Sequence, residues 1–362
     1  MQAKRLADKR LADVRRILVL NRIHIGDCLL TTPLLRALKR RFPRARVVVA
    51  TPSSNKDLLA TNPHVDEIVE RPQTGGWGAK FQFAFDMRAR GFDLVISLQE
   101  KSMFYGWATL YTKLLNGKRP ITIALDHPRT RRFYDYRIPV EPDQHEVYKY
   151  LGVANLLGCP RERNPVLELE TTEDARARVD RLITTRGFDS DSRFIGINPG
   201  GSKPNKRWGV DRFAEVANRL QEELGLPVMV LGGPGDLQRA TAIAERIKHR
   251  PLVMAGRATL GDTAALLERC RFLVTGDTGP MHMAVALAVP VVALFGPTSP
   301  IKFGPFTSLR EVLRHDQACE ECPRPCLHTI TVEECVEAAL RLYTSPPVAG
   351  HPNWVGSEQR PG

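Results

Sequence analysis

The chain has 362 residues, of which 43% are apolar and 25% charged, and it carries a formal net charge of +12. This length suits two domains of ordinary size, and the composition is that of a globular protein with a full apolar core. No run of eighteen apolar residues is present and the first residues lack the apolar segment of a signal peptide, so we expect a cytoplasmic protein. The positive charge predicts an affinity for polyanions, which include nucleic acids, anionic membranes and phosphorylated substrates.

The first sixteen residues, MQAKRLADKRLADVRR, form a weak apolar stripe among basic side chains. Two interpretations stay open for this segment. One is a short basic helix that lies on anionic lipid, and the other is a solvated terminus.

Residues 16–43 indicate a buried strand, a tight loop and a helix, because RILVLN is short and apolar and the following leucines recur at helical spacing. Asp27 comes directly after Gly26 at the start of this helix. Ligands of α/β proteins bind at the carboxyl ends of parallel strands, so Asp27 is a candidate for chemistry. The alternative is that Asp27 is the N-cap of the helix, although Pro33 leaves the start of that helix open.

Two series of short apolar runs follow one another along the chain. The first comprises residues 16–21, 46–51, 65–70 and 93–98, and the second comprises residues 194–200, 227–236, 251–256, 272–280 and 290–300. This alternation predicts two doubly wound α/β domains that face one another across a cleft, with functional loops on one edge of each parallel sheet. We place the domains at residues 1–163 and 164–345, and we expect residues 346–362, which are rich in Pro and Gly, to be a disordered tail.

The segment NPGGSKPNKRW leaves its strand with two glycines, a hydroxyl and three cations. Glycines let backbone N–H groups approach an anion, and Lys203, Lys206 and Arg207 supply counter-charge, so the segment could hold a diphosphate. The alternative is an exposed basic turn. It is not a Walker loop, because the pattern G-x4-G-K-[ST] is absent.

The segment VTGDTGPMH predicts a strand exit at residues 275–279 and a helix over residues 281–288. The first N–H groups of a helix favour an anion, so this turn could bind a phosphate. We expect Asp277 to accept hydrogen bonds from sugar hydroxyls or from the loop backbone. His282 could donate to a phosphate or could simply be packed.

The segment LGGPGD suggests a dinucleotide fingerprint but does not match one. Its order of residues is not G-x-G-x-x-G, and Pro234 removes an N–H that the motif needs. We therefore exclude NAD as a cofactor.

Four of the seven cysteines, Cys319, Cys322, Cys326 and Cys335, form the pattern C-x2-C-x3-C-x8-C. In a reducing compartment such a cluster favours metal or redox chemistry over disulfides. The spacing lacks the paired knuckles of a typical zinc site, so a structural metal and reduced, packed thiols both stay open.

Three segments, RIHIGDCLLTTPLLRALKRRFP, INPGGSKPNKRW and GDTGPMHMAVALAVPVVALFGPTSP, together resemble the ADP-heptose:lipopolysaccharide heptosyltransferases, which are glycosyltransferase family 9. The resemblance covers most of residues 14–340. It implies the GT-B architecture, with an acceptor-binding N-terminal domain and a C-terminal domain that binds a nucleotide sugar. It also implies an inverting transfer that needs neither a metal nor a cofactor.

Residue by residue, the resemblance implies that Asp27 is the catalytic base and that Lys206, with Gly201 and Ser202, binds the diphosphate. It further implies a donor-binding turn made of Asp277, Thr278, Gly279 and His282. Asp236 falls where the family often has an acidic residue near the donor, although Glu is more usual there.

The implied partners are ADP-heptose and a lipid-linked acceptor, the inner core of lipopolysaccharide, with possible peripheral contact at the cytoplasmic face of the inner membrane. The basic side chains of Arg129, Arg131, Arg132 and Arg137 could meet acidic groups of that acceptor or could be a solvated loop. No nucleic-acid-binding module is present. A transferase that uses another nucleotide sugar, and a non-catalytic protein that binds one, stay open as alternatives.

Overall fold

The computed structural model describes residues 8–72, 77–114, 119–201, 203–316, 318–319 and 322–344. The chain divides into two compact units, residues 1–168 and residues 169–362. The sequence placed the join at residues 163/164, five residues before this division. Residues 164–168 stay with the first unit because Glu168 pairs with Arg36 of helix α2 (Thr32–Arg41), and its backbone N–H donates to Thr32 Oγ1.

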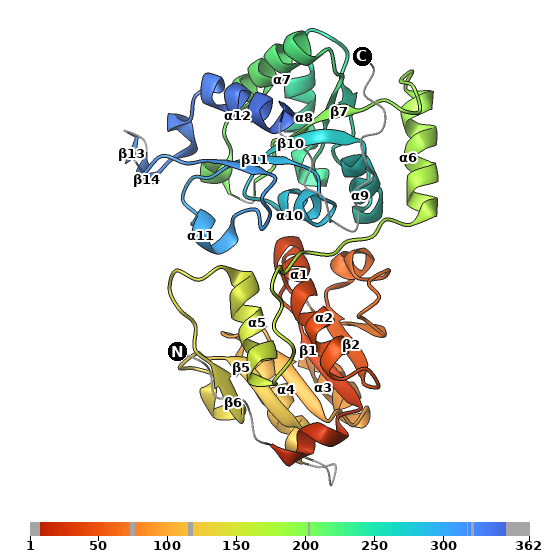
Figure 1. Ribbon diagram of the computed structural model, residues 1–362, viewed down its shortest axis with the longest axis vertical. Helices are drawn as coiled ribbons and strands as arrows, with labels where there is room; N and C mark the ends of the chain where they lie inside the picture. The colour runs from red at the N-terminus through yellow and green to blue at the C-terminus, as the bar shows by residue number, and fades with distance from the viewer. Residues whose placement is uncertain are drawn as a thin grey trace. The chain divides into compact units, whose positions relative to one another are not determined.

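Each unit is built on a parallel sheet of six strands (Figure 1). In the first unit the strand order is β3-β2-β1-β4-β5-β6, and in the second it is β12-β11-β10-β7-β8-β9. Both are the doubly wound order, in which the first strand of the unit lies in the middle and the chain then builds outward on either side. The predicted α/β class with two Rossmann-like domains is therefore confirmed.

The strands of the first unit are β1 (Arg16–Leu20), β2 (Arg46–Thr51), β3 (Glu67–Glu70), β4 (Leu94–Ser97), β5 (Ile121–Leu125) and β6 (Tyr136–Ile138). Its helices are α1 (Ile25–Leu30), α2 (Thr32–Arg41), α3 (Trp77–Ala89), α4 (Met103–Leu114) and α5 (Glu146–Leu156), and its 3-10 turns are η1 (Lys9–Asp13), η2 (Ser53–Leu58) and η3 (Arg131–Phe133). Helices α3 and α4 pack with the face of the sheet that carries Leu18 and Leu20. Helices α2 and α5 pack against each other.

The strands of the second unit are β7 (Phe194–Asn198), β8 (Val228–Val230), β9 (Leu252–Val253), β10 (Cys270–Gly276), β11 (Val291–Leu294) and β12 (Arg310–Leu313), followed by the hairpin β13 (Ala318–Cys319) and β14 (Cys322–Pro325). Its helices are α6 (Glu173–Thr185), α7 (Val210–Leu224), α8 (Leu237–Ala244), α9 (Leu260–Glu268), α10 (Gly279–Ala286), α11 (Pro300–Phe303) and α12 (Val332–Thr344), with 3-10 turns η4 (Pro204–Lys206), η5 (Pro234–Asp236) and η6 (Leu327–Thr329). Helices α7, α8 and α12 share one apolar core with the strands.

Three strands that the sequence did not indicate, β5, β6 and β12, complete the outer parts of the two sheets. The described part of the N-terminal segment, residues 8–16, contains the turn η1, whose Leu11 is buried. Because this apolar side chain packs into the unit, it does not form a lipid-facing stripe. Among the described residues, no helix is long and apolar enough to cross a membrane.

Candidate functional site

Asp27 lies in the first turn of α1, immediately after the central strand β1, at the carboxyl edge of the first sheet. The N-cap of α1 is His24, so the alternative that Asp27 is the cap residue is wrong. Pro33 does not interrupt α1. The helix ends at Leu30, and Pro33 occupies the first turn of the next helix, α2, where a missing N–H costs nothing.

The Asp27 carboxylate is 7% exposed and belongs to a chain of buried and partly buried charges. Its Oδ2 atom lies 3.4 Å from Arg22 Nε, and Arg22 Nη1 lies 3.2 Å from Glu146 Oε2. Glu146 also pairs with Lys149 one turn along α5. The four charges cancel, which lowers the cost of burying them. We call Asp27, Arg22, Glu146 and Lys149 the charge cluster.

Tyr150 borders the charge cluster from α5. Burial raises the pKa of its hydroxyl well above the ordinary value, and the charge of Asp27 raises it further, so the phenol stays neutral. Burial disfavours the charged form of Arg22, but Tyr150, Asp27 and Glu146 outweigh burial and raise the pKa of Arg22. The guanidinium therefore remains a fixed positive charge beside the Asp27 carboxylate.

In the second unit, the loops after β7 and β10 lie beside each other because these two strands are neighbours. Lys206 Nζ lies 2.8 Å from Asp277 Oδ2. Asn198, the last residue of β7, donates from Nδ2 to Thr275 Oγ1 at 2.8 Å and to Thr278 Oγ1 at 2.9 Å. Lys206 is thus one partner of Asp277, and hydrogen bonds from sugar hydroxyls or the loop backbone to Asp277 stay a prediction.

The loop that carries Lys206 is anchored by Trp208, the last residue of the KRW motif. Trp208 is 2% exposed, and its indole N–H donates to the carbonyl of Ile330 at 3.1 Å. Arg207 Nε donates to the carbonyl of Gly201 at 3.1 Å, which folds the glycine turn onto the lysine. A Cβ atom at Gly201 would lie 2.7 Å from the Lys206 carbonyl oxygen, so only glycine fits there. Ser202 lies outside the described residues.

Asp236 joins the same edge of the sheet from the loop after β8. Its Oδ2 atom accepts the Gly233 N–H at 3.1 Å, and its Oδ1 atom accepts from Arg239 Nη1 at 2.8 Å. A Cβ atom on Gly200 would lie 3.0 Å from Asp236 Oδ2, so this carboxylate lies against the β7 loop. Three loops therefore converge where the strand order of the second sheet reverses.

Helix α10 begins at Gly279, two residues before the predicted start, with Thr278 as its N-cap. The Thr278 side chain makes no capping bond and accepts from Asn198 instead, so the N-cap side chain does not satisfy the first N–H groups of the helix. His282 lies one turn into α10 and is 4% exposed. The free N–H groups at a helix N-terminus favour an anion, and phosphate binding at α10 stays a prediction.

The cysteine cluster is only partly described. Cys319 and Cys322 pair as backbone partners in the β13–β14 hairpin, and their side chains lie outside the described residues. Cys326 and Cys335 are buried, and burial raises the pKa of the Cys335 thiol. In the described part of the chain, no group of three or more His, Cys, Asp or Glu side chains could hold a metal ion. A site formed by all four thiols stays a prediction.

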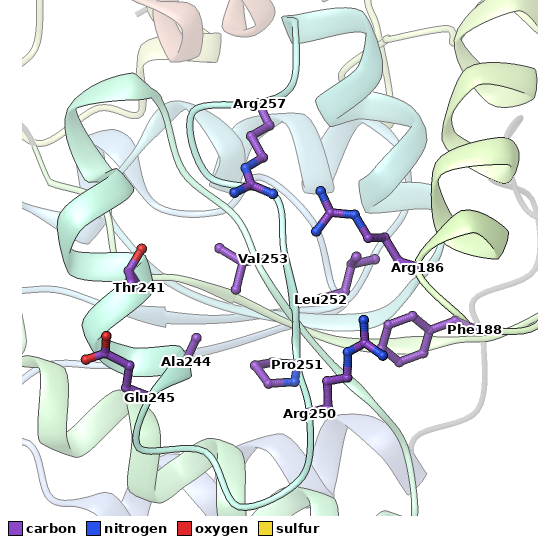
Figure 2. A pocket seen from close by; sticks show the side chains of 10 residues that line it. All are labelled: Arg186, Phe188, Thr241, Ala244, Glu245, Arg250, Pro251, Leu252, Val253 and Arg257. Carbon is purple, nitrogen blue, oxygen red and sulfur yellow. The ribbon is translucent and has the colours of Figure 1, made fainter.

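A separate hollow of about 370 Å³ runs along the edge strand β9 (Figure 2). Arg186, Arg250 and Arg257 surround it, over a floor that includes Leu252 and Val253. None of the residues that the sequence singled out lines this hollow.

Sequence reasoning missed Arg22, Lys149, Tyr150 and Asn198, and it gave Glu146 no role. The four-residue sequence from Glu146 to Lys149 has the spacing of a helical ion pair, which is a readable signal. Arg22 follows an apolar strand and Asn198 ends one, but nothing in the sequence shows what they contact. The four arginines that the sequence suggested as contacts of the acceptor are all exposed: Arg129, Arg131, Arg132 and Arg137. Arg131 pairs with Asp126 at 3.4 Å.

The chain is similar to several known proteins. The family model described as glycosyltransferase family 9 (heptosyltransferase) matches residues 81–333. Lipopolysaccharide heptosyltransferase 2 of Salmonella typhimurium is 28% identical over 319 residues, which are 83% of this chain and 88% of that protein.

Two solved structures share the fold. The glycosyl transferase family 9 protein of Veillonella parvula is 28% identical, with a TM-score of 0.84 over 94% of this chain and 99% of that one. The ADP-heptose lps heptosyltransferase II of E. coli is 24% identical, with a TM-score of 0.76 over 91% of this chain and 98% of that one. Because both units are covered, the predicted GT-B fold class is confirmed.

Proposed function

Because the chain belongs to glycosyltransferase family 9, the heptosyltransferase family, we propose that it transfers a heptose from ADP-heptose to the inner core of lipopolysaccharide. The proposal is supported by relatives whose names state heptose transfer to lipopolysaccharide and by the E. coli structure, whose name includes ADP-heptose. The observation that carries it is the convergence of three loops around Lys206 in the second unit, with a buried carboxylate, Asp27, on the carboxyl edge of the first sheet.

In the proposed mechanism the first unit activates the acceptor. Asp27 takes the proton of an acceptor hydroxyl while that oxygen forms a bond to the anomeric carbon of the heptose. Arg22, 3.4 Å from Asp27, holds the carboxylate in position, and Glu146 holds Arg22. The attack comes from the face opposite the leaving ADP, so the configuration at the anomeric carbon inverts.

The second unit stabilises the leaving group. The bond from the anomeric carbon to the diphosphate breaks, and ADP leaves with the electron pair. Lys206 and the first N–H groups of α10 stabilise the negative charge that develops on the leaving diphosphate. In other transferases a metal ion has this role. Gly201 lets the turn approach the diphosphate closely, so that backbone N–H groups can donate to it. Asp236 and Asp277 accept hydrogen bonds from hydroxyls of the nucleotide sugar.

The test is a panel of nucleotide sugars screened by thermal shift, followed by transfer assays with truncated core acceptors. A ligand that binds only the folded protein raises the melting temperature. We expect ADP-heptose to give the largest shift and to support transfer. A larger shift with a different nucleotide sugar, together with transfer of that sugar, would replace heptose in the proposal. Binding without transfer onto any acceptor would favour a non-catalytic protein.

A further inference from the structure

The hollow along β9 is bordered by Arg186, Arg250 and Arg257, and we call it the arginine hollow (Figure 2). Its volume of about 370 Å³ lies within the range of small-molecule binding sites. In Figure 2 the guanidinium groups of Arg186 and Arg257 point toward one another. The size and the charge of the hollow thus fit a small molecule that carries an anionic group.

The three guanidinium groups of the arginine hollow have no protein partner. Within the described part of the chain, none of them forms a hydrogen bond or an ion pair. Arginines of neighbouring segments are paired, Arg178 with Asp262 at 2.7 Å and Arg246 with Asp211 at 2.8 Å. The positive charge of the hollow is therefore left for a ligand to neutralise.

The fold brings these cations together against their mutual repulsion. Gly187 ends α6 with a left-handed turn, φ +79°, and a Cβ atom there would lie 3.9 Å from Arg250 Nη1. Arg250 therefore lies beside the turn that carries Arg186. Arg257 precedes Thr259, the N-cap of α9, at a helix end whose dipole disfavours a positive charge. A bound anion would offset both the repulsion and the effect of the dipole.

The charge of the arginine hollow matches a phosphate monoester. Its lining residues include three guanidinium groups and one carboxylate, that of Glu245 on α8, which leaves two positive charges in excess. A phosphate monoester carries a charge of about −1.5 to −2 at pH 7. The planar guanidinium group also donates to phosphate oxygens in pairs, which gives the contact a defined geometry.

The rest of the lining suits the organic part of such a molecule. Leu252 and Val253 form an apolar floor, and Phe188 adds an aromatic ring at the border. Thr241 and Glu245 of α8 can bond to hydroxyl groups of a ligand. A peptide that adds a strand to the sheet fits less well, because β9 is two residues long and offers few backbone groups at its edge.

The arginine hollow is separate from the candidate donor loops. Strand β9 is the outermost strand on its side of the sheet, and β8 lies between it and β7. Lys206 and Asp277 follow β7 and β10, and neither residue lines the hollow. A ligand of the hollow would therefore not occupy the candidate diphosphate site.

We propose that the arginine hollow binds a phosphate monoester with a small carbon skeleton, at a site distinct from the candidate donor site. Arg186, Arg250 and Arg257 hold the phosphate, and the carbon skeleton lies on Leu252 and Val253. Binding in this hollow does not depend on the proposed function.

The test is calorimetry of the full chain with phenyl phosphate, with and without ADP. Phenyl phosphate should bind at least about five-fold more tightly than inorganic phosphate, because its ring buries apolar area on the floor. Arg250→Gln and Arg186→Gln should each weaken binding at least about ten-fold, since each removes a charged donor. Arg246→Gln is the matched control, because Arg246 pairs with Asp211 outside the hollow, and it should bind like the wild type.

Four results would overturn the proposal. They are no binding of phenyl phosphate by calorimetry together with no broadening of its phosphorus NMR resonance, equal binding by the wild type and both hollow variants, binding that ADP abolishes, and binding of inorganic phosphate as tight as that of phenyl phosphate.

Transfer assays separate this proposal from the proposed function. Arg250→Gln should keep the wild-type rate of heptose transfer, because Arg250 is remote from the candidate donor loops in the order of strands. A wild type that binds phenyl phosphate in the hollow but transfers no heptose would contradict the proposed function alone.

Discussion

Lys206 Nζ and Asp277 Oδ2 lie 2.8 Å apart, so the candidate diphosphate-binding lysine is held by a carboxylate from the neighbouring loop. The two residues are 71 positions apart in the sequence and meet because β7 and β10 are adjacent strands. The ion pair keeps the flexible lysine side chain at the edge of the sheet. A bound diphosphate would share this ammonium with Asp277.

Lys206→Ala should weaken the binding of ADP and of ADP-heptose to a similar extent, because both ligands contain the diphosphate. Loss of a charge-assisted contact costs about 1.5 to 3 kcal/mol, which calorimetry would resolve. Lys203→Ala is the matched control, since Lys203 is an exposed cation of the same loop. If Lys203→Ala weakened ADP binding and Lys206→Ala did not, the roles of the two lysines would be exchanged.

Asp27→Asn should lower the rate of transfer by about 10²- to 10⁴-fold, because the amide cannot accept the proton of the acceptor. Donor affinity should stay within a few-fold, since the candidate donor loops belong to the second unit. Steady-state rates and ADP calorimetry on the same preparation would measure both. A folded variant with near wild-type rates would remove Asp27 from the mechanism.

Glu146→Gln should destabilise the first unit, because it breaks one buried and one partly buried ion pair and leaves Lys149 and Arg22 without their shared carboxylate. Breaking a buried pair from one side typically costs about 3 to 5 kcal/mol, which urea unfolding would detect. The double variant Glu146→Gln and Lys149→Met should recover part of the loss, since it also removes a buried charge. If the double variant were no more stable than Glu146→Gln, the unpaired Lys149 would not be the main cause of the lost stability.

Acidification should weaken the anchoring of residues 162–168. Burial alone would raise the pKa of Glu168, but His64 and Arg36 outweigh burial and lower the pKa below its ordinary value of 4.5. A lowered pKa means that the ionised Glu168 contributes stability above about pH 4.5 and that this contribution is lost as the pH falls further.

Glu168→Gln should therefore melt at a lower temperature than the wild type at pH 7, and the difference should shrink toward pH 3. Thermal unfolding at a series of pH values would follow it. Glu70→Gln, at an exposed position of β3, serves as the control and should behave like the wild type throughout. A difference in melting temperature that is independent of pH would rule out the ion-pair explanation.

Transfer activity should survive exhaustive treatment with EDTA, because Lys206 and the N-terminus of α10 supply positive charge to the leaving diphosphate. Transfer rates before and after chelation give the measurement. Loss of activity that Mg²⁺ restores would contradict this part of the mechanism. Elemental analysis of the same sample would decide whether the four C-terminal cysteines bind a metal.

The sequence by itself determined the architecture and most of the candidate site. Short β-branched runs that alternate with helical patterns specify parallel sheets, and the glycines and prolines that end those runs mark the loops at one edge. Asp27, Gly201, Lys206 and Asp277 could be chosen because each lies in the segment that follows such a strand end. These are local signals, and a local signal can be read without knowing the rest of the chain.

The tertiary structure alone decided which of these residues meet. The short or weakly patterned strands β5, β6 and β12 became strands because sheet neighbours satisfy their backbone groups. The charge cluster joins Arg22 to Glu146 across 124 positions, and Asp236 reaches the β7 loop from a different strand. Burial and pairing are properties of the packed chain. No spacing in the sequence encodes the distance between residues whose contact depends on the order of strands in a sheet.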